Sequence, residues 1–169
     1  EPGRFDLITS RFGVMFFAEP VAAFRNMLRA GKSGGRMVFI CWAAPGDNPW
    51  MGAPAAAAFA IIPAPEKPEP GTPGPFSLAD PERIKSIMGE AGFVDITVSL
   101  MEQQLNMGSV ASSLDTMTKL GPAAEPLRNA TSGQRDAAME AMRGVLEEHN
   151  TAEGVTMQSA VWLVEARIP

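Results

Sequence analysis

The sequence predicts an α/β domain with a parallel sheet, and three consecutive segments support this prediction. Phe5 to Phe12 contains the apolar pair Leu7–Ile8 and has the length of a strand. A helical pattern follows, and then Arg36 to Trp42 forms a near-continuous apolar run, as in strands that are covered on both faces. A strand, a helix and a second strand form a βαβ unit, whose right-handed crossover makes the strands parallel neighbours.

The helix between these strands is predicted to start at Glu19 and Pro20, because proline is tolerated in the first turn. Its apolar residues recur at helical spacing and should pack on the sheet; they are Val21, Phe24, Met27 and Leu28. Three glycines, at positions 31, 34 and 35, then end the helix and lead into the strand at Arg36.

Residues 43–75 are a Pro/Ala-rich loop region with a short helix expected around Met51 to Ile62. The region leaves the carboxyl end of a parallel strand, the side on which α/β folds place their ligands. We therefore expect it to lie beside a functional site.

The second half begins with a helix whose start is marked by Asp80 as N-cap and Pro81 in the first turn, and whose end is marked by Gly92. Val94 to Leu105 alternates in polarity and predicts a strand near the sheet edge. Residues 107–155 are expected to form a helical insertion, with helices over Val110 to Leu120 and Ser132 to His149. A last strand is predicted over Met157 to Ile168, which completes a single domain over residues 1–169.

Composition excludes several classes of protein. The chain of 169 residues has a net charge of -5 and no basic stripe, which argues against nucleic-acid binding. Its single cysteine, Cys41, forms no internal disulfide and is predicted to be buried, as in a reducing compartment. With neither a signal peptide nor a membrane span expected, we predict a cytoplasmic protein.

Several of these segments resemble the C-terminal half of class I S-adenosylmethionine-dependent methyltransferases, and in particular the ubiquinone/menaquinone biosynthesis enzymes. In that family a Phe-Asp pair, here Phe5-Asp6, opens the fourth strand, and a Gly-Phe pair, here Gly92-Phe93, ends a later helix. The other matching segments are Leu7–Phe17, Pro20–Phe24, Leu28–Ala30 and Gly34–Phe39. Gly31 and Ser33 depart from the Leu and Pro usual in the turn. The resemblance implies strands four to seven of a Rossmann-like sheet, with the last strand antiparallel.

The same resemblance implies that the main cofactor-binding elements lie outside these residues. The family binds S-adenosylmethionine chiefly through a glycine-rich loop and an acidic residue that precede the Phe-Asp strand, and the sequence contains no GxGxG. We therefore expect the chain to start in the middle of the domain, with Phe5–Phe12 as a buried central strand that lacks its neighbours. The chain alone should bind the cofactor weakly or not at all.

The resemblance also assigns candidate site residues after the first two strands. Ser10, Arg11 and Phe12 are carried over as cofactor-binding positions beside its methionyl end. Met15 and Phe16 are assigned as substrate-pocket walls. Phe12, Met15 and Phe16 are equally compatible with a place in the core, and Arg11 could instead cap a helix. Asn48 and Trp50 lie where substrate-side residues occur, although a solvent loop anchored by a tryptophan is the more frequent arrangement.

Other motifs carry little functional weight. Gly31-Lys32-Ser33 lacks the earlier glycine of a phosphate loop and leads into a strand, so it is a turn. His149 has no spaced His or Cys partners, which predicts a residue at a helix end and no metal site.

Two classes of function remain. The first is a methyltransferase of a small, hydrophobic substrate, present here as a part that is inactive alone. The second is a non-catalytic α/β module that associates through the exposed strand Phe5–Phe12, as a homodimer or with a partner chain. Methyl transfer relies mainly on positioning, so the lack of an acid–base dyad is compatible with the first class.

Overall fold

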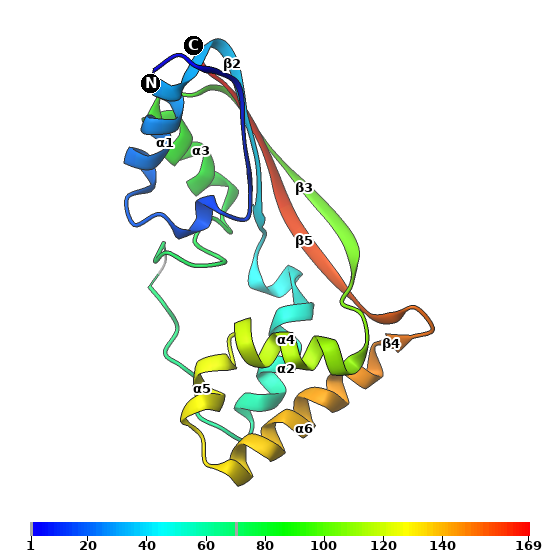
Figure 1. The fold of residues 1–169 in the computed structure, drawn as a ribbon. Helices are drawn as coiled ribbons and strands as arrows, with labels where there is room; N and C mark the ends of the chain where they lie inside the picture. The colour runs from blue at the N-terminus through cyan, green and yellow to red at the C-terminus, as the bar shows by residue number, and fades with distance from the viewer. Residues whose placement is uncertain (1, 70) are drawn as a thin grey trace. The chain divides into compact units, whose positions relative to one another are not determined.

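A computed structural model describes residues 2–69 and 71–169 and divides the chain into two compact units. The sheet unit comprises Glu1–Ala44, Pro68–Met101 and Ala160–Pro169, and the helical unit comprises Pro45–Lys67 and Glu102–Ser159. Each unit has its own hydrophobic core. Figure 1 shows the order of the elements along the chain.

The sheet has the strand order β1-β2-β5-β3, so the last long strand lies between β2 and β3. These strands are β1 (Phe5–Arg11), β2 (Gly31–Trp42), β3 (Val94–Asn106) and β5 (Gly154–Arg167). The parallel pairing of β1 with β2 confirms the predicted βαβ unit, and β5 runs antiparallel to β2 as the resemblance implies. The position of β3 at an end of this order confirms the predicted edge strand.

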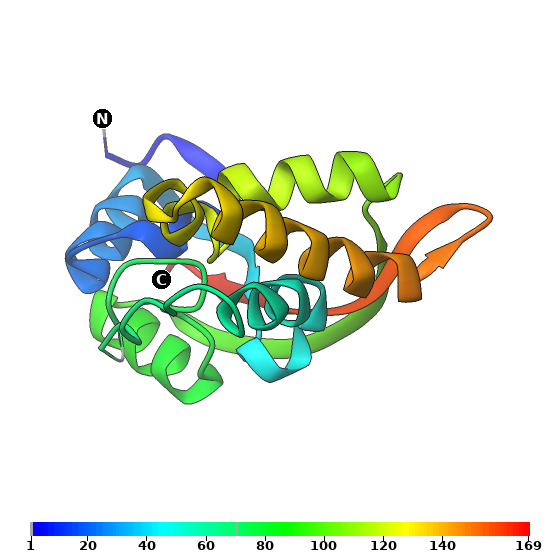
Figure 2. The same ribbon diagram turned by 90° about the horizontal axis from the view of Figure 1, so that it is seen from below.

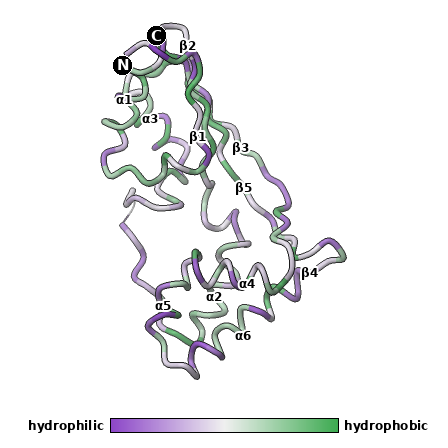
Figure 3. The backbone as a smooth tube through the Cα atoms, viewed as in Figure 1, coloured by the Kyte–Doolittle hydropathy of each residue, from purple (hydrophilic) through white to green (hydrophobic). Residues whose placement is uncertain are grey.

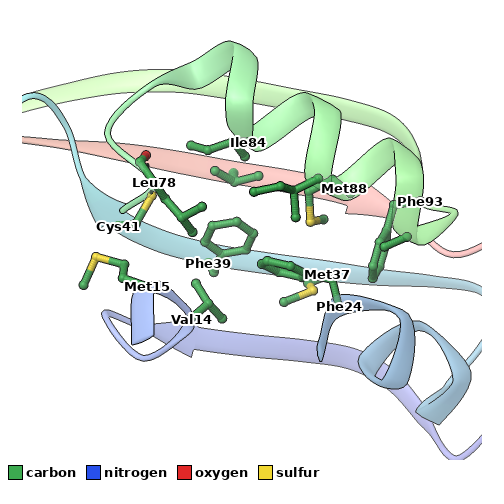
Figure 4. Packing of buried hydrophobic residues seen from close by; sticks show 14 of the residues in the cluster. Val14, Met15, Phe24, Met37, Phe39, Cys41, Leu78, Ile84, Met88 and Phe93 are labelled. Atoms are coloured by element: carbon green, nitrogen blue, oxygen red, sulfur yellow. Dashed lines mark hydrogen bonds between the residues drawn. The ribbon is translucent and has the colours of Figure 1, made fainter. Parts of the chain in front are cut away.

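Helices α1 (Pro20–Ala30) and α3 (Pro81–Ala91) pack together on one face of this sheet. Both were predicted from their capping residues, and the Asp80 carboxylate accepts a hydrogen bond of 2.9 Å from the Glu82 N–H. Gly92 ends α3 at φ 102°, a conformation that favours glycine. Figure 4 shows Phe39 of β2 at the centre of the core, between Phe24 of α1 and the side chains of α3.

The opposite face of the sheet receives neither of these helices and carries both apolar and charged side chains, the latter including Arg36, Glu165 and Arg167. Side chains alternate along β2, so Val38 and Ile40 point away from the buried Phe39, and register places Leu163 beside Ile40. Leu7 of β1 lies on the same open face, beside Arg36, and is 48% exposed. The apolar residues of this face, Leu7, Val38, Ile40 and Leu163, are exposed or only partly buried, so they can accept further packing.

Strand β1 is exposed, as predicted for a central strand that lacks its neighbours. All of its side chains are exposed or only partly buried, and Phe5 is 46% exposed. The reason is that, among the described residues, β1 pairs with β2 alone. β2 also begins earlier than predicted, because Gly31 pairs with Phe5 before an irregularity in the register, after which Leu7 pairs with Arg36.

The helical unit contains α2 (Pro49–Phe59), α4 (Val110–Leu120), α5 (Ala124–Asn129) and α6 (Ser132–Glu148). The view in Figure 2 shows α6 between α2 and α4, and both of these helices contact it. The predicted positions of α4 and α6 are confirmed, whereas α2 begins at Pro49, two residues before the prediction. The short helix α5 and the two-residue strand β4 (Asn150–Thr151) were not predicted.

Hydropathy changes along the strands that contribute residues to both units. Figure 3 shows β3 passing into a hydrophilic stretch, which corresponds to Glu102, Gln103 and Gln104. These residues are exposed, while Val155 and Met157 at the start of β5 are buried in the core of the helical unit. No helix in the described part of the chain is long and apolar enough to cross a membrane.

Cys41 is a buried free thiol, as predicted. Burial raises its pKa to about 12, because the thiolate would lose its hydration. The thiol is therefore protonated at neutral pH and is unsuited to act as a nucleophile. His149 is exposed at the end of α6, where it was expected.

Candidate functional site

A stacked aromatic pair marks the carboxyl ends of the two parallel strands. Phe12 directly follows β1 and its ring lies 4.2 Å from that of Trp42, the last residue of β2, with 17° between the planes. The Phe12 N–H donates a 3.1 Å hydrogen bond to the carbonyl of Ile40. Phe12 has φ 58°, a left-handed conformation that is rare for a bulky side chain. Residues in such conformations cluster at functional sites, because the surrounding structure must hold them there.

Two polar residues at the end of β1 directly precede Phe12. Ser10 lies opposite Phe39 and is partly buried, whereas Arg11 lies opposite Ile40 and is exposed. The backbone at Gly13 passes close to Ser10: a Cβ atom at position 13 would lie only 3.2 Å from Ser10 Oγ. Because Ser10 and Arg11 are consecutive on β1, their side chains point to opposite faces of the sheet, and Phe12 follows them at the end of the strand.

Met15 and Phe16 have different environments although they are neighbours in a short 3-10 turn, η1 (Val14–Phe16). Met15 is 2% exposed and belongs to the core of the sheet unit, and its carbonyl accepts hydrogen bonds from Ser77 Oγ at 2.5 Å and Gly74 N at 3.0 Å. Phe16 is exposed. Of the two predicted pocket walls, only Phe16 is available to a ligand in this structure.

Asn48 and Trp50 belong to the helical unit, at the start of α2. Asn48 is fully buried, and its side-chain Oδ1 accepts a hydrogen bond of 3.1 Å from Trp50 Nε1. The backbone carbonyl of Asn48 accepts from the N–H groups of Met51 and Gly52. These hydrogen bonds hold the start of α2, and Trp50 also lines a pocket of the helical unit.

The helical unit also contains an apolar pocket that the sequence did not reveal. Trp50 and Ala55 of α2, Met117 and Leu120 of α4, and Met142 of α6 contribute to its lining. Trp42, the last residue of β2 in the sheet unit, was predicted only as part of a strand, although α/β folds place their ligands outside the carboxyl ends of parallel strands. Within residues 2–69 and 71–169, no three His, Cys, Asp or Glu side chains converge as metal ligands.

Comparison with known proteins supports the fold through solved structures only. A scan of protein-family models and a search of curated proteins found no match. The structure of a Bacillus halodurans protein described as a methyltransferase is similar, with 14% sequence identity and a TM-score of 0.51; the match covers 99% of this chain and 71% of the other. A cyclopropane-fatty-acyl-phospholipid synthase-like protein from Lactobacillus casei is 15% identical with a TM-score of 0.51, covering 98% and 56%. The chain has a class I methyltransferase fold.

The chain spans much less than the full length of several of these structures. It covers 35% of a Haemonchus contortus phosphoethanolamine N-methyltransferase, with all of the present chain matched at 16% identity and a TM-score of 0.47. Within the methyltransferase fold, the described sheet corresponds to the predicted four strands with the antiparallel last strand.

The left-handed backbone at Phe12 can be tested by comparing two substitutions. Alanine normally stabilises a chain relative to glycine, but at φ 58° the Cβ is unfavourable by about 1 to 2 kcal/mol. We expect Phe12→Gly to unfold at higher urea concentration than Phe12→Ala, the reverse of the usual order. Both variants lose the stacking on Trp42, so this loss cancels in the comparison. The usual order, with Phe12→Ala the more stable, would contradict the conformation described here.

Proposed function

We propose that the chain is the C-terminal part of an S-adenosylmethionine-dependent methyltransferase that acts on a small, hydrophobic substrate. The observation that carries this proposal is the aromatic pair Phe12–Trp42, with Ser10 and Arg11, at the carboxyl ends of parallel strands in a methyltransferase fold. Ser10, Arg11 and Phe12 contact the methionyl end of the cofactor, and Phe16 lies on the substrate side. No step requires a metal or an acid–base pair, because the sulfonium is already activated and the protein supplies orientation.

We further propose that the sheet is completed by strands and helices outside these residues. Support comes from two features that the structure leaves open: the edge of β1 that faces away from β2, and the exposed or partly buried apolar residues Leu7, Val38, Ile40 and Leu163 on the face that α1 and α3 do not cover. An open, apolar edge strand is an aggregation hazard unless it is covered. The missing elements would supply the glycine-rich loop, so the 169-residue chain alone is inactive, and residues 107–155 are an insertion of the same domain. The free thiol of Cys41 suits a cytoplasmic location.

Calorimetric titration with S-adenosylmethionine tests this function. We expect no micromolar binding by the 169-residue chain, and micromolar binding by a protein extended with the residues that its gene encodes before Glu1. In the extended protein Ser10→Ala should weaken binding about tenfold, the effect of losing one hydrogen bond to a charged ligand. Thr9→Ala is the matched control, because Thr9 is the preceding β1 residue and points to the opposite face.

Two results would contradict the proposal in different ways. Micromolar binding by the 169-residue chain would show that no further strands are needed. Absence of binding by the extended protein would remove the methyltransferase assignment itself. For the isolated 169-residue chain we also propose that a second copy covers the open edge of β1. Light scattering should then give the molar mass of a dimer, and a monomer would oppose this proposal.

A further inference from the structure

The apolar pocket of the helical unit is formed entirely by residues of that unit. Its walls come from the first half of α2, the end of α4, the α4–α5 connection and the middle of α6. The pocket therefore belongs to a part of the chain with its own core, separate from the candidate site on β1 and β2.

The side chains around the pocket can contact hydrocarbon but offer little to a charged ligand. Three of them are methionines, Met51, Met117 and Met142, whose flexible thioethers adapt to apolar ligands of different shape. The Trp50 N–H already donates to Asn48, and Thr116 contributes a hydroxyl. No Lys, Arg, Asp or Glu side chain is part of the described lining.

The size of the pocket limits what it can hold. Its volume is about 160 Å³. An engineered apolar cavity of about 150 Å³ in another protein stays free of water and binds benzene. A single aromatic ring, or a hydrocarbon segment of similar volume, therefore fits this space.

Leu120 indicates that the pocket opens to solvent. This residue lines the pocket, and yet it is 84% exposed. A ligand seated against Leu120 would remove part of this apolar area from water, which is favourable by about 25 cal/mol per Å².

We propose that this pocket binds the uncharged ring or short hydrocarbon portion of a small molecule. The proposal does not depend on methyl transfer, because the pocket is built by the helical unit alone. Binding is driven by burial of apolar surface, and an anionic ring compound is rejected because no cation lines the pocket to offset the loss of its hydration.

Titration with toluene, followed through the methyl resonances of ¹³C-labelled methionine, tests the proposal. We expect shifts at Met51, Met117 and Met142, with a dissociation constant on the order of 0.1 to 1 mM for so small a ligand. Met15, Met37 and Met88, in the core of the sheet unit, provide internal controls that should not shift. Benzoate should leave all of these resonances unchanged. Absence of toluene shifts, or equal shifts in both groups of methionines, would overturn the proposal.

A pair of substitutions on α2 locates the binding. Ala55 is buried and lines the pocket, whereas the next residue, Ala56, is exposed. Ala55→Leu fills part of the volume and should abolish the toluene-dependent shifts, while Ala56→Leu should leave them in place. Shifts that persist in Ala55→Leu would place the toluene elsewhere and so overturn the assignment.

A second variant keeps the test decisive if Ala55→Leu does not fold. Leu120→Ala removes an exposed side chain, so we expect the fold to be unaffected, and it should weaken toluene binding about three- to tenfold. Leu100→Ala, at an exposed position on β3, is the control and should not change the affinity. Unchanged affinity in Leu120→Ala would contradict the proposed mouth of the pocket.

Discussion

Replacement of Phe39 by alanine should lower the free energy of unfolding by about 3 to 5 kcal/mol, the range for removing a large aromatic side chain from a core. Phe39 is 1% exposed and lies at the centre of the sheet unit's core, with its ring 5.5 Å from that of Phe24. The cost is large because α1 and α3 both pack against this strand, so neither helix can close the cavity without losing contacts with the other. Urea unfolding followed by circular dichroism measures the change.

Phe16→Ala is the matched control for this experiment. It removes the same side chain from an exposed position, so we expect a change within about 0.5 kcal/mol. Equal effects of the two substitutions would contradict the packing described here. A small effect of Phe16→Ala on stability would also leave this residue free to be tested for a role in substrate binding.

The elements that could be predicted from the sequence are those whose start and end depend on local chemistry. Asp80 caps α3 through its own carboxylate and Gly92 ends it with a left-handed backbone, so both limits are marked by neighbouring residues. The apolar stripe of α6, with Met142 and Leu146, likewise follows from helical spacing and is buried as expected. The parallel pairing of β1 and β2 follows from the crossover rule.

Features that depend on distant partners could not be predicted in this way. The stacking of Phe12 on Trp42 depends on a left-handed backbone at Phe12 itself, where the sequence has neither glycine nor asparagine to indicate it. The apolar pocket requires Ala55, Leu120 and Met142 to meet from three helices, although each is an ordinary residue of an apolar stripe in its own segment.

Loss of the hydrogen bond between Asn48 and Trp50 should also lower the stability of the protein substantially. Asn48→Ala removes the buried Oδ1 atom that accepts the hydrogen bond from Trp50 Nε1. We expect the free energy of unfolding to fall by about 2 to 3 kcal/mol, because the Trp50 N–H loses this partner. Asp47→Ala, at the exposed neighbouring position, should change stability by less than about 0.5 kcal/mol. If Asn48→Ala were equally neutral, its position at the start of α2 would instead favour a ligand-binding role.

A double-mutant cycle separates the hydrogen bond from the packing of the two side chains. Trp50→Phe keeps an aromatic ring in the core of the helical unit but removes the indole N–H. We expect Trp50→Phe to be less destabilising in the Asn48→Ala background than in the unchanged protein, with a coupling of about 0.5 to 1.5 kcal/mol. The coupling arises because the first substitution has already removed the acceptor that the N–H needs. Strict additivity of the two substitutions would mean that Asn48 stabilises α2 through its other contacts, and that Trp50 is held by packing alone.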